Sequence, residues 1–421
     1  MSNYYLSLHA FLNKGLGVML NEVVNVLIGY VIFIAVINLL YSIYKDKFKK
    51  AGVEVSGITI VWRVFRKEIV PSETLFKRIR KYCYVLDALV LIMIGSLFLG
   101  LKILFENMFG IVEAVGAAQA PAKGVVTPVV PLIPGVTISL ANLPVMLAVI
   151  ALAALVHEGM HAIVSLTEGS RIKSAGLALI TIILAPFVEL EEKDFEKLRL
   201  RSKLRILSAG VSGNVGLAIV SIVLFALLLP MFFNLYPGLY IAGVVENSAA
   251  KEANIPENMV IVAINGTFFS DKVNVLTLLF NPQKLNDVLS EFKLKGRTLA
   301  LKLMDSKNPD KIVDVVVVRN STGDPIGVYL YPYIVMKPKG VLEAKIGYFA
   351  QTFLIWSFAI NLGLAAINAI PIFITDGGKA LDEALKLKFR RNGAFISRAI
   401  QGFLLAILLV NMVFSVMLYM P

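Results

Sequence analysis

The chain contains six long apolar segments, each longer than the roughly 20 residues that a helix needs to cross the hydrocarbon core of a bilayer. Between the fourth and the fifth, from about Tyr236 to Tyr333, apolar and polar positions alternate over short stretches, as they do in half-buried strands. This pattern predicts a polytopic α-helical membrane protein with an inserted extramembrane α/β domain. The apolar segments run from about Leu16 to Tyr44, Val85 to Phe105, 142 to 167, Leu204 to Phe232, Ile346 to Ile372 and Phe395 to Tyr419.

Two further stretches are expected to adopt other structures. Ser174–Leu190 is apolar but interrupted by Pro186 and too short to span, so we expect a re-entrant hairpin covered by protein. Pro121–Pro144 is rich in Pro, Gly and β-branched residues, which predicts a structured hairpin or loop at the outer surface. The expected parts are 1–141 with two membrane helices and a basic loop, 142–232 with the core spans and the hairpin, the extramembrane domain 233–340, and the C-terminal membrane segment 341–421.

Lys and Arg are distributed unevenly among the connecting segments. Residues 45–81 carry 11 of them, 168–203 carry 7 and 376–398 carry 6, whereas 1–15 and 106–141 carry one each. Because basic residues concentrate in short cytoplasmic loops, the three rich segments are expected in the cytoplasm and both termini outside. The alternation of spans then places the inserted domain on the outer side.

Composition agrees with a membrane protein and excludes some function classes. Of the 421 residues, 57% are hydrophobic and only 17% are charged. The net charge of +12 could indicate nucleic-acid binding, but the basic residues lie beside apolar segments, which favours a membrane face and no nucleic acid. The single cysteine, Cys83, excludes an internal disulfide.

The third apolar segment carries the motif Val156-His157-Glu158-Gly159-Met160-His161. Histidines four apart lie on one face of a helix, where both can bind one zinc ion, and the adjacent glutamate can take a proton from metal-bound water. Structural histidines, hydrogen-bonded to their neighbours, are the alternative. The chain has only three histidines, however, and polar clusters in apolar spans usually mark function.

A catalytic zinc ion, one per chain, needs a third protein ligand. The remaining histidine, His9, lies in the N-terminal segment, so a carboxylate from elsewhere is expected. Asp376 is a candidate because Pro371 breaks the fifth apolar segment and Gly377-Gly378 should loosen the backbone after it. The local residues leave a second interpretation open, in which Asp376 only caps the helix from Gly377 to Lys386.

The extramembrane domain shows its own local signals. Asn265-Gly266 and Gly323-Asp324 predict turns, and Asn247–Ala253 predicts a short capped helix. The run Gly243–Ala250 followed by Val260–Gly266 resembles a PDZ domain of the bacterial protease type. Such domains bind a peptide as an added strand, whereas a folded spacer without a ligand is the alternative. The expected strands are Ile241–Val245, Met259–Ile264, Thr298–Met304 and Ile312–Arg319. One departure is Glu257-Asn258-Met259, where these PDZ domains usually carry Gly-Asp.

Three motifs in separate spans together resemble the site-2 protease family of intramembrane metalloproteases. They are the His157–His161 motif, Asn368-x-x-Pro371-x-x-x-x-Asp376-Gly377, and Gly210-x-x-x-Asn214 in the fourth span. The resemblance covers roughly residues 130–390, and an inserted PDZ domain is also a feature of this family. Thr375 departs from the pattern, because the family usually has Leu before Asp-Gly.

The resemblance implies zinc held by His157, His161 and Asp376, with Glu158 as general base and then general acid. It also implies that Asn214 and Asn368 orient the substrate backbone or the oxyanion. The substrates would be single-pass transmembrane proteins cut near the cytoplasmic side, held extended by an edge of the 174–190 hairpin. The alternatives are a membrane zinc protease of the Ste24 type, a non-catalytic zinc-bound PDZ scaffold, and a transporter, which the lack of an inverted repeat disfavours.

Overall fold

The computed structural model describes residues 28–71, 83–116, 142–180, 183–281, 296–389 and 392–419. The chain divides into two compact units. The first comprises Met1–Ala218 and Ala359–Pro421, and the second comprises Ile219–Phe358.

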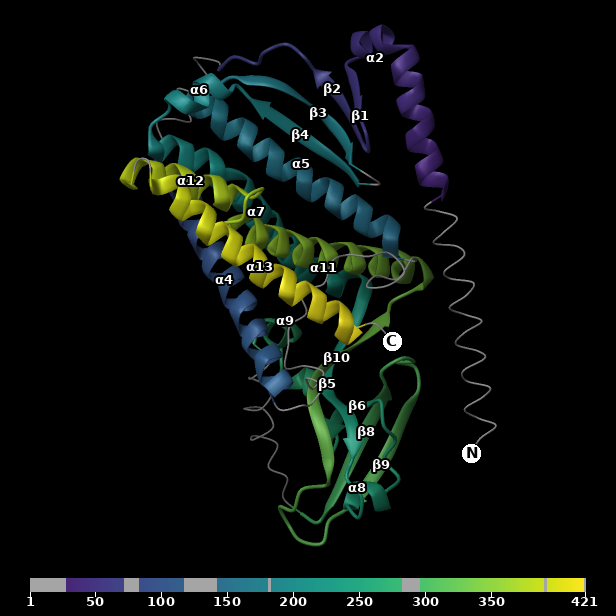
Figure 1. The fold of residues 1–421 in the computed structure, drawn as a ribbon. Helices are drawn as coiled ribbons and strands as arrows, with labels where there is room; N and C mark the ends of the chain where they lie inside the picture. The colour runs from purple at the N-terminus through teal and green to yellow at the C-terminus, as the bar shows by residue number, and fades with distance from the viewer. Residues whose placement is uncertain are drawn as a thin grey trace, which may run out of the picture. The chain divides into compact units, whose positions relative to one another are not determined.

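Five helices in the described residues are long and apolar enough to cross a membrane. A sixth candidate is bent by 98°, between the helix Ile28–Ile43 and α2 (Lys45–Ala51). These helices agree with the predicted membrane protein (Figure 1). The start of the first predicted segment and nearly all of the predicted outer loop lie outside the described residues. The five helices are α4 (Cys83–Gly116), α5 (Leu143–Glu168), α7 (Leu200–Phe232), α11 (Val341–Ala369) and α13 (Gly393–Tyr419).

The first unit contains a four-stranded antiparallel sheet of order β1-β2-β3-β4 beside α5 (Figure 1). The predicted hairpin is present as β3 (Ile172–Ile180) and β4 (Ile183–Leu190). Its partner hairpin, β1 (Val53–Ser56) and β2 (Thr59–Phe65), lies in the basic segment that we expected to be a loop. The two short β-branched runs turn at Gly57, whose φ of 57° suits glycine.

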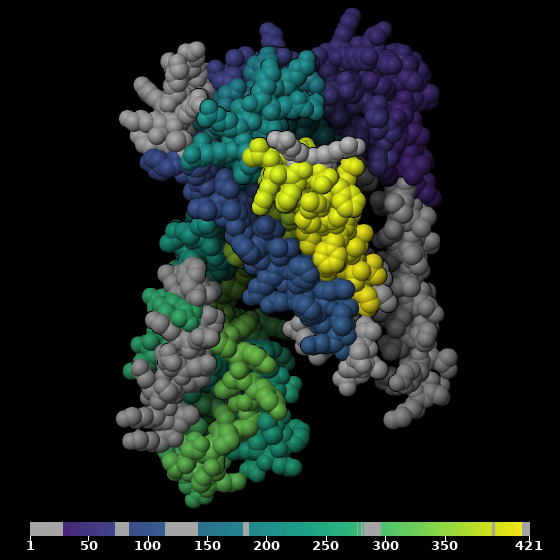
Figure 2. Space-filling view, turned by 60° about the vertical axis from the view of Figure 1, so that its left-hand side comes forward, coloured from purple at the N-terminus to yellow at the C-terminus, as the bar shows by residue number. Residues whose placement is uncertain are grey.

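Leucine and isoleucine side chains pack α4 against α13 in the first unit. Leu104 of α4 is buried against Leu404 and Ile407 of α13, and the Asn411 amide donates to the Leu104 carbonyl at 3.3 Å. Figure 2 shows α4 and α13 side by side along this contact. α12 (Asp376–Phe389) and the short α6 (Glu192–Lys197) complete the unit.

An ion network that is buried at Arg205 and Glu168 and more exposed at Asp87 and Arg201 joins three of these helices near their ends. Arg205 of α7 lies 2.8 Å from Glu168 at the end of α5 and 2.8 Å from Asp87 of α4. Arg201, one turn before Arg205, also pairs with Asp87. Removing one partner of a buried pair leaves an uncompensated charge, so this network fixes the register of α7 against α5.

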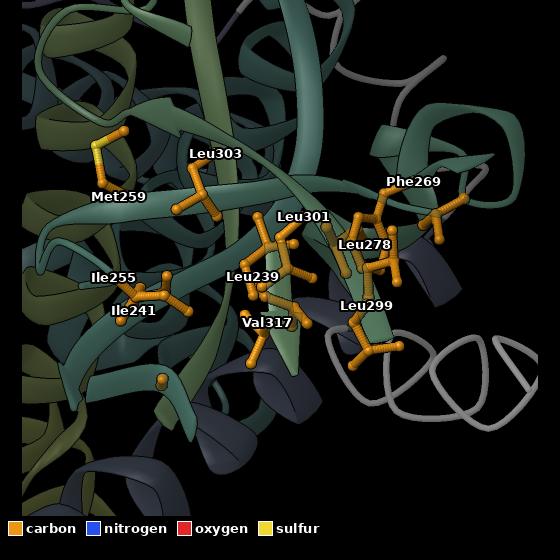
Figure 3. Close-up of a cluster of buried hydrophobic side chains, with 14 residues drawn as sticks. Leu239, Ile241, Ile255, Met259, Phe269, Leu278, Leu299, Leu301, Leu303 and Val317 are labelled. Carbon is orange, nitrogen blue, oxygen red and sulfur yellow. The ribbon is translucent and has the colours of Figure 1, made fainter. Parts of the chain in front are cut away.

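The second unit holds a sheet of order β10-β5-β6-β8-β9, with β7 (Thr267–Phe268) paired to β6. Its core lies between the sheet and the short helices, with Leu239, Leu301, Leu303 and Val317 among the buried side chains (Figure 3). The strands are β5 (Phe233–Val244), β6 (Met259–Ile264), β8 (Thr298–Asp305), β9 (Ile312–Val318) and β10 (Val328–Pro338); the helices are α8 (Ala249–Glu252), η2 (Phe269–Asp271) and α9 (Val275–Phe280).

Most local predictions in this unit agree with the structure, but β5 begins eight residues before the expected Ile241, and two strands, β7 and β10, were missed. Ser248 caps α8 by accepting from the Lys251 amide at 3.3 Å, and Asn265 and Gly266 both have positive φ at the β6–β7 turn. The longer of the two missed strands, β10, pairs with β5 along its whole length. The segment becomes a strand by pairing with β5, which lies far away in the sequence, and no short-range sequence signal specifies this pairing.

Candidate metal and catalytic site

Helix α5 places the two histidines. Pro144 lies in its first turn, and Gly169 ends it in the left-handed conformation with φ 92°. His157 and His161 lie on one face of this helix, and their Nε2 atoms are 3.1 Å apart. The His161 Nδ1 donates to the Ile206 carbonyl of α7 at 2.7 Å, so its Nε2 presents a lone pair.

The third residue comes from the break after α11. This helix ends at Ala369, and α12 begins at Asp376. The Asp376 Oδ2 lies 3.1 Å from the Nε2 of both His157 and His161. The structure therefore brings together the three residues that we expected to bind metal, although 215 positions separate His161 from Asp376.

Thr375 explains why the Asp376 carboxylate is available. The Thr375 hydroxyl accepts from the amides of Gly378 (3.1 Å) and Ile372 (3.2 Å) and donates to the Ile370 carbonyl at 2.6 Å. Thr375 is thus the N-cap of α12, and the interpretation of Asp376 as the cap is wrong. Thr375, the departure from the family pattern, closes the turn that carries Asp376.

The two glycines after Asp376 have a different role from the one expected. A Cβ on Gly377 would lie 2.1 Å from the Ala369 carbonyl oxygen, and one on Gly378 would lie 2.0 Å from that of Ile372. Real Cβ atoms do not approach so closely, so these glycines allow α12 to start directly against the preceding turn. They permit close packing and do not loosen the backbone.

The spacing of the three atoms fits zinc. In a tetrahedral site with zinc–ligand bonds of about 2.0–2.1 Å, neighbouring ligand atoms are about 3.3 Å apart. The observed separations are 3.1 Å on all three sides. Asp376 and His161 are buried, and three acceptor atoms at this distance repel one another unless a cation or shared protons lie between them.

Gly210 of α7 packs directly onto the histidine pair. A Cβ at this position would lie 2.4 Å from the His161 Nε2 and 2.6 Å from the His157 Nε2. Any larger residue would occupy the space in which the ligand atoms converge. This close contact explains why the first position of the Gly210-x-x-x-Asn214 motif must be glycine.

Glu158 lies beside the three ligands in a cavity of about 600 Å³. Its Oε2 accepts from the Val188 amide of β4 at 3.0 Å. β4 is the outer strand of its sheet, so this amide points away from β3. Pro186 faces the same way, and there its missing N–H breaks no bond of the ladder.

A comparison with protein families bears on this arrangement. The model of the family described as Peptidase family M50 matches residues 145–414, which include both metal motifs. The chain belongs to peptidase family M50. M50 peptidases are membrane zinc metalloproteases, so the match confirms the resemblance to site-2 proteases. A comparison with curated proteins found no match.

Both asparagines expected to assist the reaction line the cavity of this M50 member. Asn214 is fully buried, and neither atom of its amide has a hydrogen-bond partner in the described part of the chain. A buried amide without partners is costly, so Asn214 is available to bind a group that enters the cavity. Asn368 lies in the last turn of α11, before the break.

Sequence reasoning missed several contributors to the M50 site. Ile206 and Val188 act through backbone atoms, so their side chains carry no signal. Lys379 also lines the cavity, with its ammonium 4.0 Å from the Asp376 Oδ1. Thr375 could have been found, because a threonine three residues before Gly378 at a helix start is a capping signal.

Proposed function

We propose that this M50 peptidase is an intramembrane zinc metalloendopeptidase of the site-2 type that hydrolyses peptide bonds of membrane-spanning proteins. The observation that carries the proposal is the meeting of His157, His161 and Asp376 beside Glu158 in one cavity. Family membership supports the metalloprotease class.

The residues divide the chemistry among them. A zinc ion on His157, His161 and Asp376 would supply a Lewis acid and a water of lowered pKa. Glu158 takes the proton of the attacking water and returns it to the nitrogen of the leaving amine. Its Oε2 is held by the Val188 amide, so the carboxylate keeps one orientation while Oε1 stays free to carry the proton.

Asn214 and Asn368 assist at the scissile carbonyl. The Asn214 side chain offers an amide N–H to an oxygen that gains negative charge, and it does so without first breaking another hydrogen bond. Asn368, in the last turn of α11, orients the substrate backbone. Both roles rest on the cavity lining and on the resemblance of the two motifs to the site-2 family.

The substrate must be extended at the cut, because a helix hides its carbonyls in hydrogen bonds. The outer edge of β4 lines the cavity through Pro186, Phe187 and Val188, and it can pair with an extended segment. We therefore propose single-pass transmembrane proteins, locally unwound, as substrates.

We further propose that the protein is oriented by its basic segments. The positive-inside rule places both termini and the 233–340 domain outside, with the zinc site toward the cytoplasm. The 233–340 domain would act as a PDZ-type module that binds a peptide or screens substrates. Its capped α8 and its five long antiparallel strands support this assignment.

The test is cleavage by the purified full-length protein in detergent. A single-pass transmembrane substrate should be cut within its span, the product should disappear with a zinc chelator, and added zinc should restore it. Cleavage that persists without bound metal would refute the proposal. Full zinc occupancy without cleavage would favour a non-catalytic zinc-bound scaffold, whereas the M50 match argues against a Ste24-type enzyme.

A further inference from the structure

The N-terminal part of the first unit contains a basic helix at a right angle to an apolar one. The apolar helix Ile28–Ile43 meets α2 at 98°. α2 has the sequence KDKFKKA, with four lysines in seven residues. An apolar helix that continues into a perpendicular basic helix is typical of a span whose extension lies along the bilayer surface.

This helix is fixed to the hairpin that follows it. The Arg66 guanidinium donates to the carbonyls of Lys50 (2.5 Å) and Arg63 (3.3 Å). Gly52 makes room for it, since a Cβ there would lie 2.3 Å from the Arg66 Nε. The Asn38 amide donates to the Gly57 carbonyl at 2.9 Å. The apolar helix, α2 and the β1–β2 hairpin are thus tied together.

A second cavity, of about 450 Å³, lies where α2 and the sheet meet. Its acidic groups are already paired. Glu54 lies 2.7 Å from Arg63, and Glu189 lies 2.5 Å from Lys173, which lowers the pKa of Glu189. The charged residues that line it are Lys49, Glu54, Arg63, Arg66, Lys173 and Glu189.

Two cations in this cavity have no acidic partner among the described residues. They are Lys49 and Arg66, and Arg66 retains one terminal nitrogen beyond its two carbonyl contacts. The cavity therefore keeps an excess of positive charge in a rigid setting. A guanidinium and an ammonium that line one cavity suit a phosphate group.

The hairpin also exposes large apolar side chains, on the face of the sheet opposite to the cavity. Trp62 is 48% exposed and Phe65 is 60% exposed, together with Ile58 and Val64. Tryptophan is enriched at the level of lipid headgroups, where a polar edge and an apolar body are both accommodated. Because α2, which contributes Lys49, is expected to lie along the bilayer surface, a lipid headgroup matches this cavity better than free phosphate does.

We propose that this cavity binds the headgroup of an anionic phospholipid, with Lys49 and Arg66 contacting the phosphate. The lipid would anchor the β1–β2 hairpin and, through β3, the outer strand β4. This site is independent of the zinc chemistry, because none of its lining residues lines the cavity of Glu158.

The test is lipid binding by the full-length protein. The protein is titrated with phosphatidylglycerol or phosphatidylcholine, and the bound lipid is measured by native mass spectrometry. The wild type should retain phosphatidylglycerol preferentially. Lys49→Gln with Arg66→Gln should weaken this binding roughly thirtyfold, since each basic residue near an anionic lipid surface is worth a factor of about five. The matched control is Lys307→Gln with Lys311→Gln, two exposed lysines of the second unit, and it should bind as the wild type does.

Three outcomes would overturn the proposal. They are unchanged lipid binding by the cavity variant, equal losses in both double variants, and a wild type that binds both lipids equally. Inorganic phosphate at millimolar concentration should not displace the lipid, and displacement would indicate an anion site without lipid selectivity. Zinc content, which the substitutions should leave unchanged, reports that the variant is folded. If the variant cannot be purified, the wild-type titration alone decides.

Discussion

The two sheets of the molecule are built in different ways. The sheet of the second unit uses strands from one continuous stretch, 233–338, and buries its own core of leucine, isoleucine and valine. The sheet of the first unit joins β1–β2 to β3–β4 across more than a hundred residues, and its outer strand faces the cavity of Glu158. One sheet stabilises a domain by itself, whereas the other holds an unpaired edge beside the reactive groups. Substitutions in the two sheets should therefore affect different measurements.

Glu158→Gln should have the largest effect on the reaction. The amide cannot accept the proton, so cleavage should fall by roughly a thousandfold or more, within the range expected for loss of a general base. Zinc content by metal analysis should stay at one per chain, because Glu158 is not among the three ligands. Residual turnover near that of the wild type would assign the base to another group.

Asp376→Asn should act on the metal. Zinc binding free energies of about 10–16 kcal/mol are shared by three or four ligands, so the affinity should fall roughly a thousandfold. Titration with a competing chelator measures this directly. Full occupancy in the variant would show that another carboxylate completes the site.

Leu303→Ala tests the second unit. Leu303 is fully buried in the core of the sheet, so the truncation should destabilise that unit by about 2–5 kcal/mol. Limited proteolysis should show increased cutting between 233 and 338, while zinc content stays unchanged. A parallel loss of zinc would mean that the two units do not fold independently.

Thr375→Val keeps the shape of the side chain and removes the hydroxyl that closes the turn before Asp376. Groups that orient a metal ligand typically contribute tenfold to a hundredfold in affinity, and we expect about tenfold here. Thr375→Ser, which retains the hydroxyl, should restore the affinity. If serine and valine behave alike, packing and not hydrogen bonding is what Thr375 provides.

Val188→Pro removes the amide that the Glu158 carboxylate accepts from, on the side of β4 where proline breaks no ladder bond. Cleavage should fall severalfold while zinc content is kept, because only the orientation of the carboxylate is lost. Phe187→Pro is the contrasting variant, since its amide points toward β3 and its loss should disturb the sheet. Equal effects of the two substitutions would contradict the orientation assigned to β4.

Much of this organisation was predictable from local patterns. The apolar segments predicted the membrane helices, and the spacing of His157 and His161 predicted two ligands on one helix face. The residues around Asp376 fitted either a metal ligand or a helix cap. The resemblance of the combined motifs to the site-2 protease family favoured the metal ligand. The capping role of Thr375 then removed the competing interpretation.

What was missed depends on contacts between distant parts of the chain or on backbone atoms. The β1–β2 hairpin is short and is flanked by basic residues. It becomes part of a larger sheet only because β2 pairs with β3. The Ile206 carbonyl and the Val188 amide exist at every residue, so no side-chain pattern can mark them. Gly210 was noted for its motif, but its contact with both imidazoles became visible only once α7 was placed against α5.

Pro186 and Val188 also determine what kind of chain the outer edge of β4 can accept. Pro186 has no amide hydrogen, and the Val188 amide already donates to Glu158. This stretch therefore offers mainly carbonyl oxygens to an incoming segment. An incoming segment must therefore bring the hydrogens itself. A segment with proline or N-methylated residues at the facing positions could form no hydrogen bonds with these carbonyls. Binding at this edge would therefore depend on the backbone of the incoming segment before it depends on its side chains.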